Sequence, residues 1–220
     1  MPTSSRTGSS FIAETERERL LAAFGRAVYA DGLEGTHLAD VSRNAGFDSS
    51  VAASYWQDET ACLIDAVDVA TSQAFSRVAQ AFLSTRGDYA VAAHHALATL
   101  LSDVAACPEM VYLTVVELPR LGPVGHAQQA RIVDLFCEFL LPGFAATNHP
   151  IPDPEIVTMS LGGGVWETVR RLAVERRLAA LPAELPAISF VCISTFFGPE
   201  EALRVSRMPV RVAPRRPVAR

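Results

Sequence analysis

The chain has 220 residues, of which 50% are hydrophobic, a formal net charge of −5 and four widely separated cysteines. This length can bury a substantial core, the acidic balance excludes attraction to nucleic acid by net charge alone, and the cysteine spacing excludes a disulfide framework or a CxxC metal site. No uninterrupted apolar run reaches the roughly 18 residues of a membrane span and no signal-like segment is present, so we expect a cytoplasmic protein with reduced, buried thiols and no membrane contact.

Residues 1–15 are polar and are expected to form a flexible arm, which a helix over about 16–30 follows. Apolar residues between Leu20 and Val28 recur at i, i+4, i+7 and i+8, which places them on one face of that helix. The sequence DGLEG then ends the helix, and the hydroxyl of Thr36 is expected to cap the next one.

Two short helices joined by a turn are predicted after Thr36, in the stretch THLADVSRNAGFDSSVAASYW. The glycine at position 46 supplies the turn, and the second of these helices ends near Tyr55. With the helix over 16–30 they form a three-helix head over residues 16–63. This arrangement is the shape of a helix-turn-helix, which places its second helix in the major groove of DNA.

Further helices are predicted along the rest of the chain, because prolines and glycines separate stretches of helical periodicity rather than alternating strands. Their expected ranges are Glu59–Thr85, Tyr89–Ala106, Pro108–Leu118, Val124–Phe144, Pro154–Leu181 and Pro186–Phe197, with Gly198-Pro199 as a stop. The fold class is therefore all-α, with a C-terminal helical domain over residues 64–203. The three consecutive glycines at 162–164 indicate a kink or a close approach of another helix.

Residues 204–220 carry six arginines, no acidic residue and three prolines, whereas residues 1–63 carry five arginines and nine acidic residues. We expect 204–220 to be a flexible tail, and non-specific binding of nucleic acid by this tail is the alternative.

The head resembles that of the tetracycline-repressor-like (TetR) family of bacterial transcription regulators. That head typically reads T-T-hydrophobic-x-x-I-A-x-x-A-G-V-S-x-G-T-L-Y-x-Y-F-x-x-K, and the chain matches it, at the same spacing, at Thr36, Val41, Ala45, Gly46, Phe47, Tyr55 and Trp56. The resemblance implies a homodimer that binds a double-stranded, palindromic operator and is released by a small hydrophobic effector. It also implies that the last two long helices pack against those of the partner subunit.

Several residues of the head are candidates for binding DNA. A helix N-terminus binds phosphate through free backbone N–H groups, small polar residues read base edges, and an arginine adds a phosphate contact. The candidates are Thr36, His37, Arg43, Ser49, Ser50, Val51, Ser54 and Tyr55.

Two departures from the family pattern weaken the case for DNA binding. Ala53 stands where the family has a phosphate-contacting tyrosine, and Glu59 stands where it has a phosphate-contacting lysine. Phosphate contacts supply most of the non-specific affinity for DNA. The alternatives are a head that serves only as a packing unit and a dimeric ligand- or partner-binding protein with weak or no DNA binding.

Seven residues of the second domain are candidates for a ligand pocket, since such pockets are apolar with a few polar groups. They are Phe75, Phe82, His94, Tyr112, Glu117, Phe136 and Trp166, and the alternative for each is an ordinary core position or, for His94 and Glu117, a solvent-facing one. No catalytic or metal motif is present: the single Glu-x-x-His, Glu34 to His37, has no second copy. We therefore expect a ligand-responsive repressor that is not an enzyme and needs no cofactor.

Overall fold

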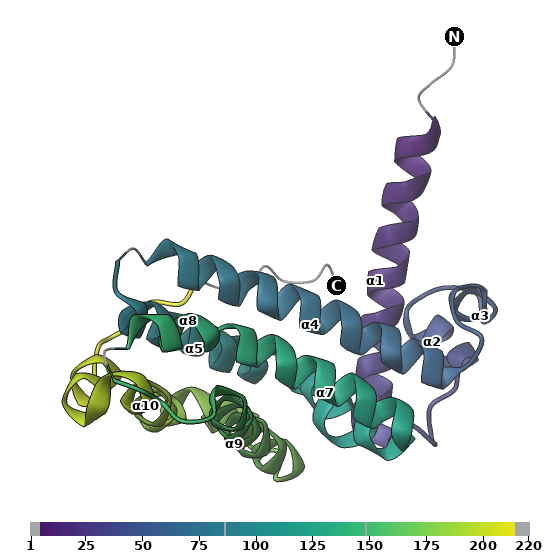
Figure 1. Ribbon diagram of the computed structural model, residues 1–220. Helices are drawn as coiled ribbons and strands as arrows, with labels where there is room; N and C mark the ends of the chain where they lie inside the picture. Colours follow the sequence, from purple (N-terminus) through teal and green to yellow (C-terminus); the bar gives the residue numbers. More distant parts are fainter. Residues whose placement is uncertain (1–4, 86, 148, 214–220) are drawn as a thin grey trace. The chain divides into compact units, whose positions relative to one another are not determined.

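The computed structural model describes residues 5–85, 87–147 and 149–213 (Figure 1). Within these ranges the chain forms helices and no β-strand, so the predicted all-α fold class is confirmed. The elements are α1 (Ser5–Asp31), α2 (Leu38–Asn44), α3 (Val51–Tyr55), α4 (Glu59–Ser84), α5 (Tyr89–Ala106), α6 (Pro108–Tyr112), the π-helix η1 (Leu113–Glu117), the 3₁₀-helix η2 (Leu118–Leu121), α7 (Pro123–Glu138), α8 (Leu141–Ala146), α9 (Pro154–Val174), the 3₁₀-helix η3 (Leu178–Glu184) and α10 (Leu185–Ser206).

The chain divides into two compact units, with the boundary between Asp68 and Val69. The head expected from the sequence ends at residue 63, and both positions lie in α4. The first turns of α4 therefore belong to the first unit and its later turns to the second.

The first unit contains α1, α2 and α3. Its core includes the predicted face of α1, since Leu20, Phe24 and Val28 are fully buried. The expected flexible arm over 1–15 is wrong for residues 5–15, because α1 begins at Ser5. An established helix gains one hydrogen bond for each residue that joins it, so it extends readily through a stretch with few helix breakers.

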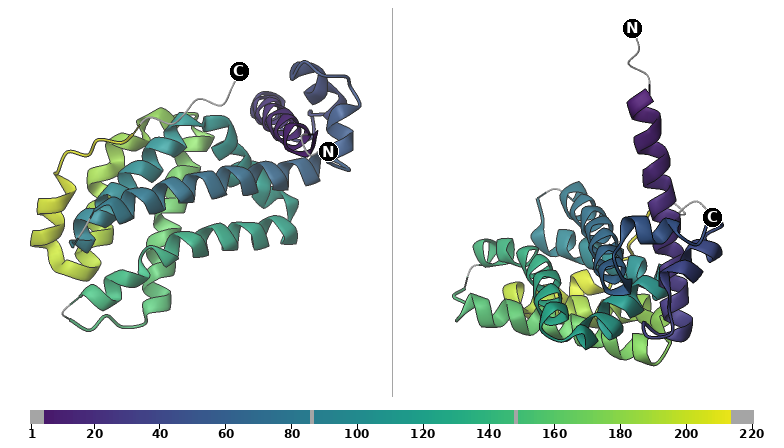
Figure 2. Two further views of the ribbon diagram at one scale, coloured as in Figure 1. Left: turned by 90° about the horizontal axis from the view of Figure 1, so that it is seen from above. Right: turned by 90° about the vertical axis from the view of Figure 1, so that its right-hand side faces the viewer.

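The second unit is organised around α5, which packs against α10 and η3 (Figures 1 and 2). Small alanines on several sides of α5 are buried, among them Ala90, Ala92, Ala93, Ala96 and Ala98. Their size allows neighbouring helices to approach closely on more than one face. α5 is thus the central helix of this unit.

The predicted helix Val124–Phe144 is divided into α7 and α8. Pro142 has no N–H and cannot continue the hydrogen-bond ladder, so nearby carbonyl groups lose helical partners. The hydroxyl of Tyr89 lies 3.0 Å from the carbonyl oxygen of Phe139 and 3.3 Å from that of Leu140. A side chain of α5 therefore donates to backbone carbonyl groups at the break in the helix.

The two last predicted helices also differ from the structure. α9 ends at Val174, before the expected Leu181, and Arg176 then adopts a left-handed φ of 56°. Gly198 has a φ of 78° and bends α10, but the helix resumes and continues to Ser206. The expected stop at Gly198-Pro199 is therefore a kink.

The glycine run in α9 produces no break in this helix. A Cβ atom added at Gly162 would lie 3.2 Å from Cys137 Sγ and 3.3 Å from a methyl group of Val133, whereas one added at Gly163 or Gly164 would meet nothing within 4 Å. Of the two predicted explanations, close approach to α7 therefore holds at Gly162. Gly163 and Gly164 leave part of the α9 surface without side chains.

The tail expected to be flexible over 204–220 is ordered where the structure describes it. Residues 204–206 are the last turn of α10, and Met208 packs on the core cluster that contains Ile193 and Val205. The remaining residues, 214–220, lie outside the described ranges. The flexible-tail prediction is thus wrong for residues 204–213.

Among the residues that the structure describes, one continuous segment, Leu178–Ser206, is long and apolar enough by length and composition to cross a bilayer. A second candidate consists of Tyr89–Ala106 and Pro108–Leu121, which are bent by 97° with respect to each other. Only 28% of the most apolar stretch of Leu178–Ser206 is buried. The second unit by itself therefore leaves much of the apolar surface of α10 uncovered.

Candidate nucleic-acid interface and ligand pocket

The angle between α2 and α3 is fixed by one buried serine. Ser42 Oγ donates to the carbonyl oxygen of Leu38 at 3.1 Å and accepts from the backbone N–H of Ala52 at 2.8 Å. Ser42 and Ala52 are both fully buried. Gly46, with a φ of 80°, provides the left-handed turn between the two helices.

Two arginines of α1 support this arrangement from within the first unit. Arg19 donates to the carbonyl oxygen of Ala45 at 2.7 Å, and its guanidinium lies 4.5 Å from the ring centroid of Phe47. Arg17 pairs with Asp65, which also accepts from the indole N–H of Trp56 at 2.8 Å. Both guanidinium groups are thus engaged in internal contacts.

The exposed side of α3 and of the turn before it carries small polar residues. Ser49, Ser50 and Ser54 are exposed, while Ala52 on the opposite side is buried. Ser50 Oγ donates to Asp48 at 2.8 Å and Ser54 Oγ donates to the carbonyl oxygen of Val51 at 2.7 Å. The backbone N–H of Ser50 lowers the pKa of Asp48, so a negative charge lies beside these serines.

Val51 and Tyr55, the other two candidates on α3, are half-buried. The hydroxyl of Tyr55 donates to Glu16 Oε1 at 3.2 Å. Arg43 is exposed and forms an ion pair with Asp40, one turn earlier on α2. Much of the positive charge of Arg43 is therefore balanced locally.

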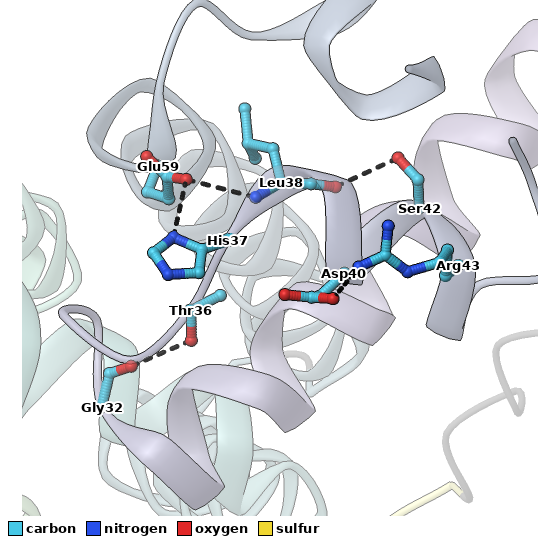
Figure 3. A network of polar contacts seen from close by, with 8 residues as sticks. All are labelled: Gly32, Thr36, His37, Leu38, Asp40, Ser42, Arg43 and Glu59. Carbon is cyan, nitrogen blue, oxygen red and sulfur yellow. Dashed lines mark hydrogen bonds and ion pairs between the residues drawn. The ribbon is translucent and has the colours of Figure 1, made fainter. Parts of the chain in front are cut away.

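Figure 3 shows the N-terminus of α2, where Glu59 replaces the cation that the TetR resemblance leads one to expect. Glu59 Oε1 accepts from the backbone N–H of Leu38 at 3.2 Å and lies 3.8 Å from His37 Nδ1. The predicted cap by Thr36 is wrong, because its hydroxyl donates instead to the carbonyl oxygen of Gly32 at 2.9 Å. The backbone N–H of Leu38, which was expected to be free to bind phosphate, therefore already donates to a carboxylate.

The second unit contains a small apolar cavity. It measures about 20 Å³, which is about the space that one water molecule needs. Helices α4, α5, α7 and α10 and the turn before α8 line it with Val78, Phe82, Tyr89, Ala93, Ala96, Leu97, Leu100, Phe136, Phe139, Leu140, Cys192, Ile193 and Phe196. Burial raises the pKa of the Cys192 thiol to about 12, so this group remains neutral in the lining.

Two of the seven predicted ligand-binding residues line this cavity, and a third packs against a lining residue. Phe82 and Phe136 line it. Phe75 stacks on the lining residue Phe139, with ring centroids 5.8 Å apart, but does not itself line the cavity. The sequence therefore locates part of the pocket on α4 and α7.

The structure places the other four predicted residues elsewhere in the second unit. His94 is fully buried and Glu117, nearly so, lies 3.3 Å from Arg120 Nη1, while Trp166 packs against a core cluster. The ring of Tyr112 lies 4.3 Å from the guanidinium carbon of Arg176. Burial lowers the pKa of His94 and favours the neutral ring.

Residues that the sequence analysis missed complete the pocket, above all Tyr89, Phe139 and Phe196. The ring of Tyr89 packs edge-on against Phe82 and Phe196, with centroids 5.7 and 5.9 Å apart. Tyr89 begins α5 and Phe139 directly follows the last residue of α7, and helical periodicity is a weak guide at such positions. The cavity itself is apolar throughout, and no charged side chain lines it.

The four cysteines form no disulfide. Cys62 and Cys192 are buried as expected, whereas Cys107 and Cys137 are only half-buried. Burial also raises the pKa of Cys62. These two buried thiols behave as small apolar core groups.

Comparison with solved structures identifies the fold, although no protein-family model and no curated protein matches the sequence. The fatty acid degradation regulator FadR from Bacillus halodurans is similar with a TM-score of 0.73 at 12% identity, over 81% of this chain and 94% of that one. FadR from Bacillus subtilis, in complex with stearoyl-CoA, has a TM-score of 0.71 at 14% identity, over 80% and 97%. A TetR-family regulator from Shewanella sp. PV-4 has a TM-score of 0.62 at 16% identity, over 81% and 96%.

These proteins are transcription regulators of all-α architecture, and several similar structures carry the TetR name. The chain therefore has the TetR-like fold, which confirms the resemblance stated from the motif in the head. At these identities the likeness establishes the fold and not the function.

Proposed function

We propose that the protein is a homodimeric, ligand-responsive regulator of transcription, a repressor, that binds a palindromic operator through α3. The observation that carries this proposal is the TetR-like fold with a helix-turn-helix whose second helix has an exposed polar side. Ser54 on α3 and Ser49 and Ser50 in the turn before it are accessible, and Ser42 holds the helix in place. Serine hydroxyls hydrogen-bond to base edges in the major groove.

A dimer is supported by the apolar surface of the last two long helices. Val191 on α10 and Ile156 and Met159 on α9 are each more than half exposed. Gly163, one helical turn beyond Met159, has open space over its Cα atom. A second copy of the chain would cover these residues, and large exposed apolar patches are typical of such interfaces.

The pocket supports an apolar effector. A lining without charged side chains favours a hydrocarbon chain or a neutral ring and disfavours a buried carboxylate or phosphate. Since the cavity is only about 20 Å³, such a ligand has to separate the helices that line it. Val78 and Phe82 lie on α4, the helix that begins in the first unit, so this helix can transmit the change.

The mechanism is a population shift between a DNA-binding state and a released state. An effector changes the balance only by the difference between its affinities for the two states. Occupation of the pocket moves α4, and the separation of the two α3 helices in the dimer then departs from the roughly 34–36 Å between successive major grooves. DNA affinity falls as a result.

The test of this function is a titration of the protein with a duplex from upstream of its own gene and with a shuffled duplex, followed by fluorescence anisotropy. A regulator binds the upstream duplex about 10³-fold or more tightly than the shuffled one. Equal affinities, or no complex at low salt, would refute the proposal.

A second candidate function is a dimeric ligand- or partner-binding protein that does not bind DNA. It is favoured by the contact of Glu59 with the N-terminus of α2 and by the exposed Ala53, which offers no hydrogen bond to phosphate. A carboxylate repels phosphate, and desolvating it costs free energy.

Glu59→Lys separates the two functions. In a regulator the variant gains one phosphate contact in each protomer, so the slope of log K against log salt becomes steeper by about 2 for the dimer. Glu59→Gln keeps an acceptor for the Leu38 N–H and removes only the charge, so its effect is smaller. Glu138→Lys makes the same charge change on the exposed side of α7 and should leave the slope unchanged. If neither Glu59 variant changes the affinity for DNA or its salt dependence, the second candidate function is favoured.

Val191→Asp tests the dimer. A carboxylate on the proposed interface would be buried against apolar surface, so sedimentation velocity should show a monomer where the natural chain is a dimer. Leu83→Asp is the matched control, because Leu83 is even more exposed but lies near the end of α4. A Val191→Asp chain that sediments like the natural one would exclude this face.

A further inference from the structure

Helix α8 is a short element that packs against three of the helices around the apolar cavity, α5, α7 and α10. It has six residues, whereas the helices that line the cavity, α4, α5, α7 and α10, have between 16 and 26. A helix as short as α8 is not stable by itself in water, so it depends on its contacts with the rest of the unit. Ligand-binding lids are drawn from elements of this kind, which open at a low cost in free energy.

The inner side of α8 lies on two rings of the cavity lining. Gly143 is buried, and a Cβ atom added there would lie 2.9 Å from the hydroxyl oxygen of Tyr89 and 3.0 Å from the ring of Phe196. Phe144 packs edge-on against Phe196, with ring centroids 5.0 Å apart. Leu141, at the start of the helix, is exposed. α8 therefore lies between these two lining rings and the solvent.

Tyr89 ties the beginning of α8 to α5. Its hydroxyl lies 3.0 Å from the carbonyl oxygen of Phe139 and 3.3 Å from that of Leu140, in the break between α7 and α8. Burial raises the pKa of Tyr89, and the nearby Cys192 adds to this effect, so the phenol remains protonated and can donate. One O–H group therefore holds the start of α8 against α5.

Thr147 ties the end of α8 to α10. Its hydroxyl donates to the carbonyl oxygen of Phe196 at 2.7 Å. Gly198, two residues further along the chain, bends α10, so this hydrogen bond lies beside the kink. The net contribution of one such bond is modest, because both groups bond to water once the helix has moved away. Each end of α8 is thus held by a contact that can break without unfolding the unit.

We propose that α8 is the lid through which an apolar ligand enters the cavity, and that Tyr89 and Thr147 are the two latches that keep it closed. The proposal rests on the apolar ligand pocket of the proposed function. A lid is needed because a cavity of about 20 Å³ has room for about one water molecule, so a ligand as small as benzene enters only when the cavity opens. When α8 moves away, the rings of Tyr89 and Phe196 lose their cover and the ligand reaches the lining from that side.

Cys192 can report the opening of the lid, because it belongs to the cavity lining and is only 3% exposed. N-Ethylmaleimide, a small neutral reagent, reaches this thiol when the cavity is open, and peptide mass spectrometry gives the rate of labelling. Tyr89→Phe keeps the ring and removes one latch, while Thr147→Val keeps the shape of the side chain and removes the other. Each variant should raise the labelling rate of Cys192 about 3- to 10-fold, as expected for the loss of one hydrogen bond.

Thr168→Val is the matched control. The Thr168 hydroxyl is exposed and donates to the carbonyl oxygen of Gly164 within α9, at 2.9 Å, so its loss should leave the labelling of Cys192 unchanged. Amide hydrogen exchange in α5 controls for opening of the whole unit, since α5 is its central helix. In both latch variants the amide protons of α8 should exchange faster, while those of α5 keep the rate of the natural chain.

Unchanged labelling of Cys192 in either latch variant would overturn the proposal. Amide protons of α5 that exchange faster in the same proportion as those of α8 would also overturn it, because the whole second unit would then open rather than the lid. Neither measurement uses DNA or an effector, so its result is independent of the operator test. A protein that binds no duplex can still show the latches, and a regulator without them still distinguishes the upstream duplex from the shuffled one.

Discussion

Changing Phe196 to alanine is expected to lower the free energy of unfolding by about 3–5 kcal/mol. The ring is 1% exposed and packs edge-on against Phe144, with centroids 5.0 Å apart, and against Tyr89. A Cβ atom at Gly143 would lie 3.0 Å from this ring, so the backbone of α8 also rests on it. Urea unfolding followed by circular dichroism measures the loss.

The same variant tests whether the apolar cavity is a ligand site. Removal of the ring enlarges a cavity whose lining is apolar, and such a space stays dry and accepts a small neutral ring such as benzene. Benzene should therefore raise the unfolding midpoint of Phe196→Ala more than that of the natural chain. Phe196→Leu, which fills most of the volume, should lie between the two. If benzene has no selective effect on the alanine variant, the helices have collapsed into the space and the pocket is not adaptable.

The sequence predicts the helices well where one physical signal acts alone. Periodic apolar residues place Leu20, Phe24 and Val28 on the buried side of α1, and α5 begins and ends at the predicted residues. Helix ends that depend on contacts with residues distant in the sequence are not predicted. The break before α8 involves the distant Tyr89, and the left-handed Arg176 after α9 follows no proline or glycine.

The candidate sites show the same difference between features set by local sequence and features set by contacts between distant residues. The TetR-like motif correctly predicts the helix-turn-helix, and the turn residue Gly46 has the left-handed conformation that this motif requires. The contact between Glu59 and the Leu38 N–H joins residues 21 positions apart, so no local pattern predicts it. The pocket lining comes from several helices, and a single helix pattern cannot say which aromatic residues face one another. Phe82 and Phe136 line the cavity while Trp166 belongs to a core cluster.

Arg77→Leu is expected to lower the free energy of unfolding by about 3–5 kcal/mol, because it leaves the carboxylate of Asp103 buried without a cation. The side chain of Asp103 is 3% exposed, whereas that of Arg77 is 25% exposed. The converse change, Asp103→Leu, should therefore cost less, since the guanidinium it leaves behind reaches water. Arg77→Leu also removes the donor to Ala213 and should make the amide protons of residues 207–213 exchange faster.

The double variant Arg77→Leu/Asp103→Leu separates two contributions to the free energy of unfolding. One is the cost of burying the Asp103 carboxylate without a cation, and the other is the contribution of the ion pair itself. Replacing both partners with apolar residues of similar size is often close to neutral, so the double variant should unfold at nearly the natural urea concentration. The amide protons of residues 207–213 should nevertheless exchange as fast in the double variant as in Arg77→Leu, because the hydrogen bond from Arg77 to Ala213 is missing in both. A loss below about 1 kcal/mol in Arg77→Leu would mean that the pair behaves like an exposed one. In that case Asp103 reaches water when Arg77 is removed.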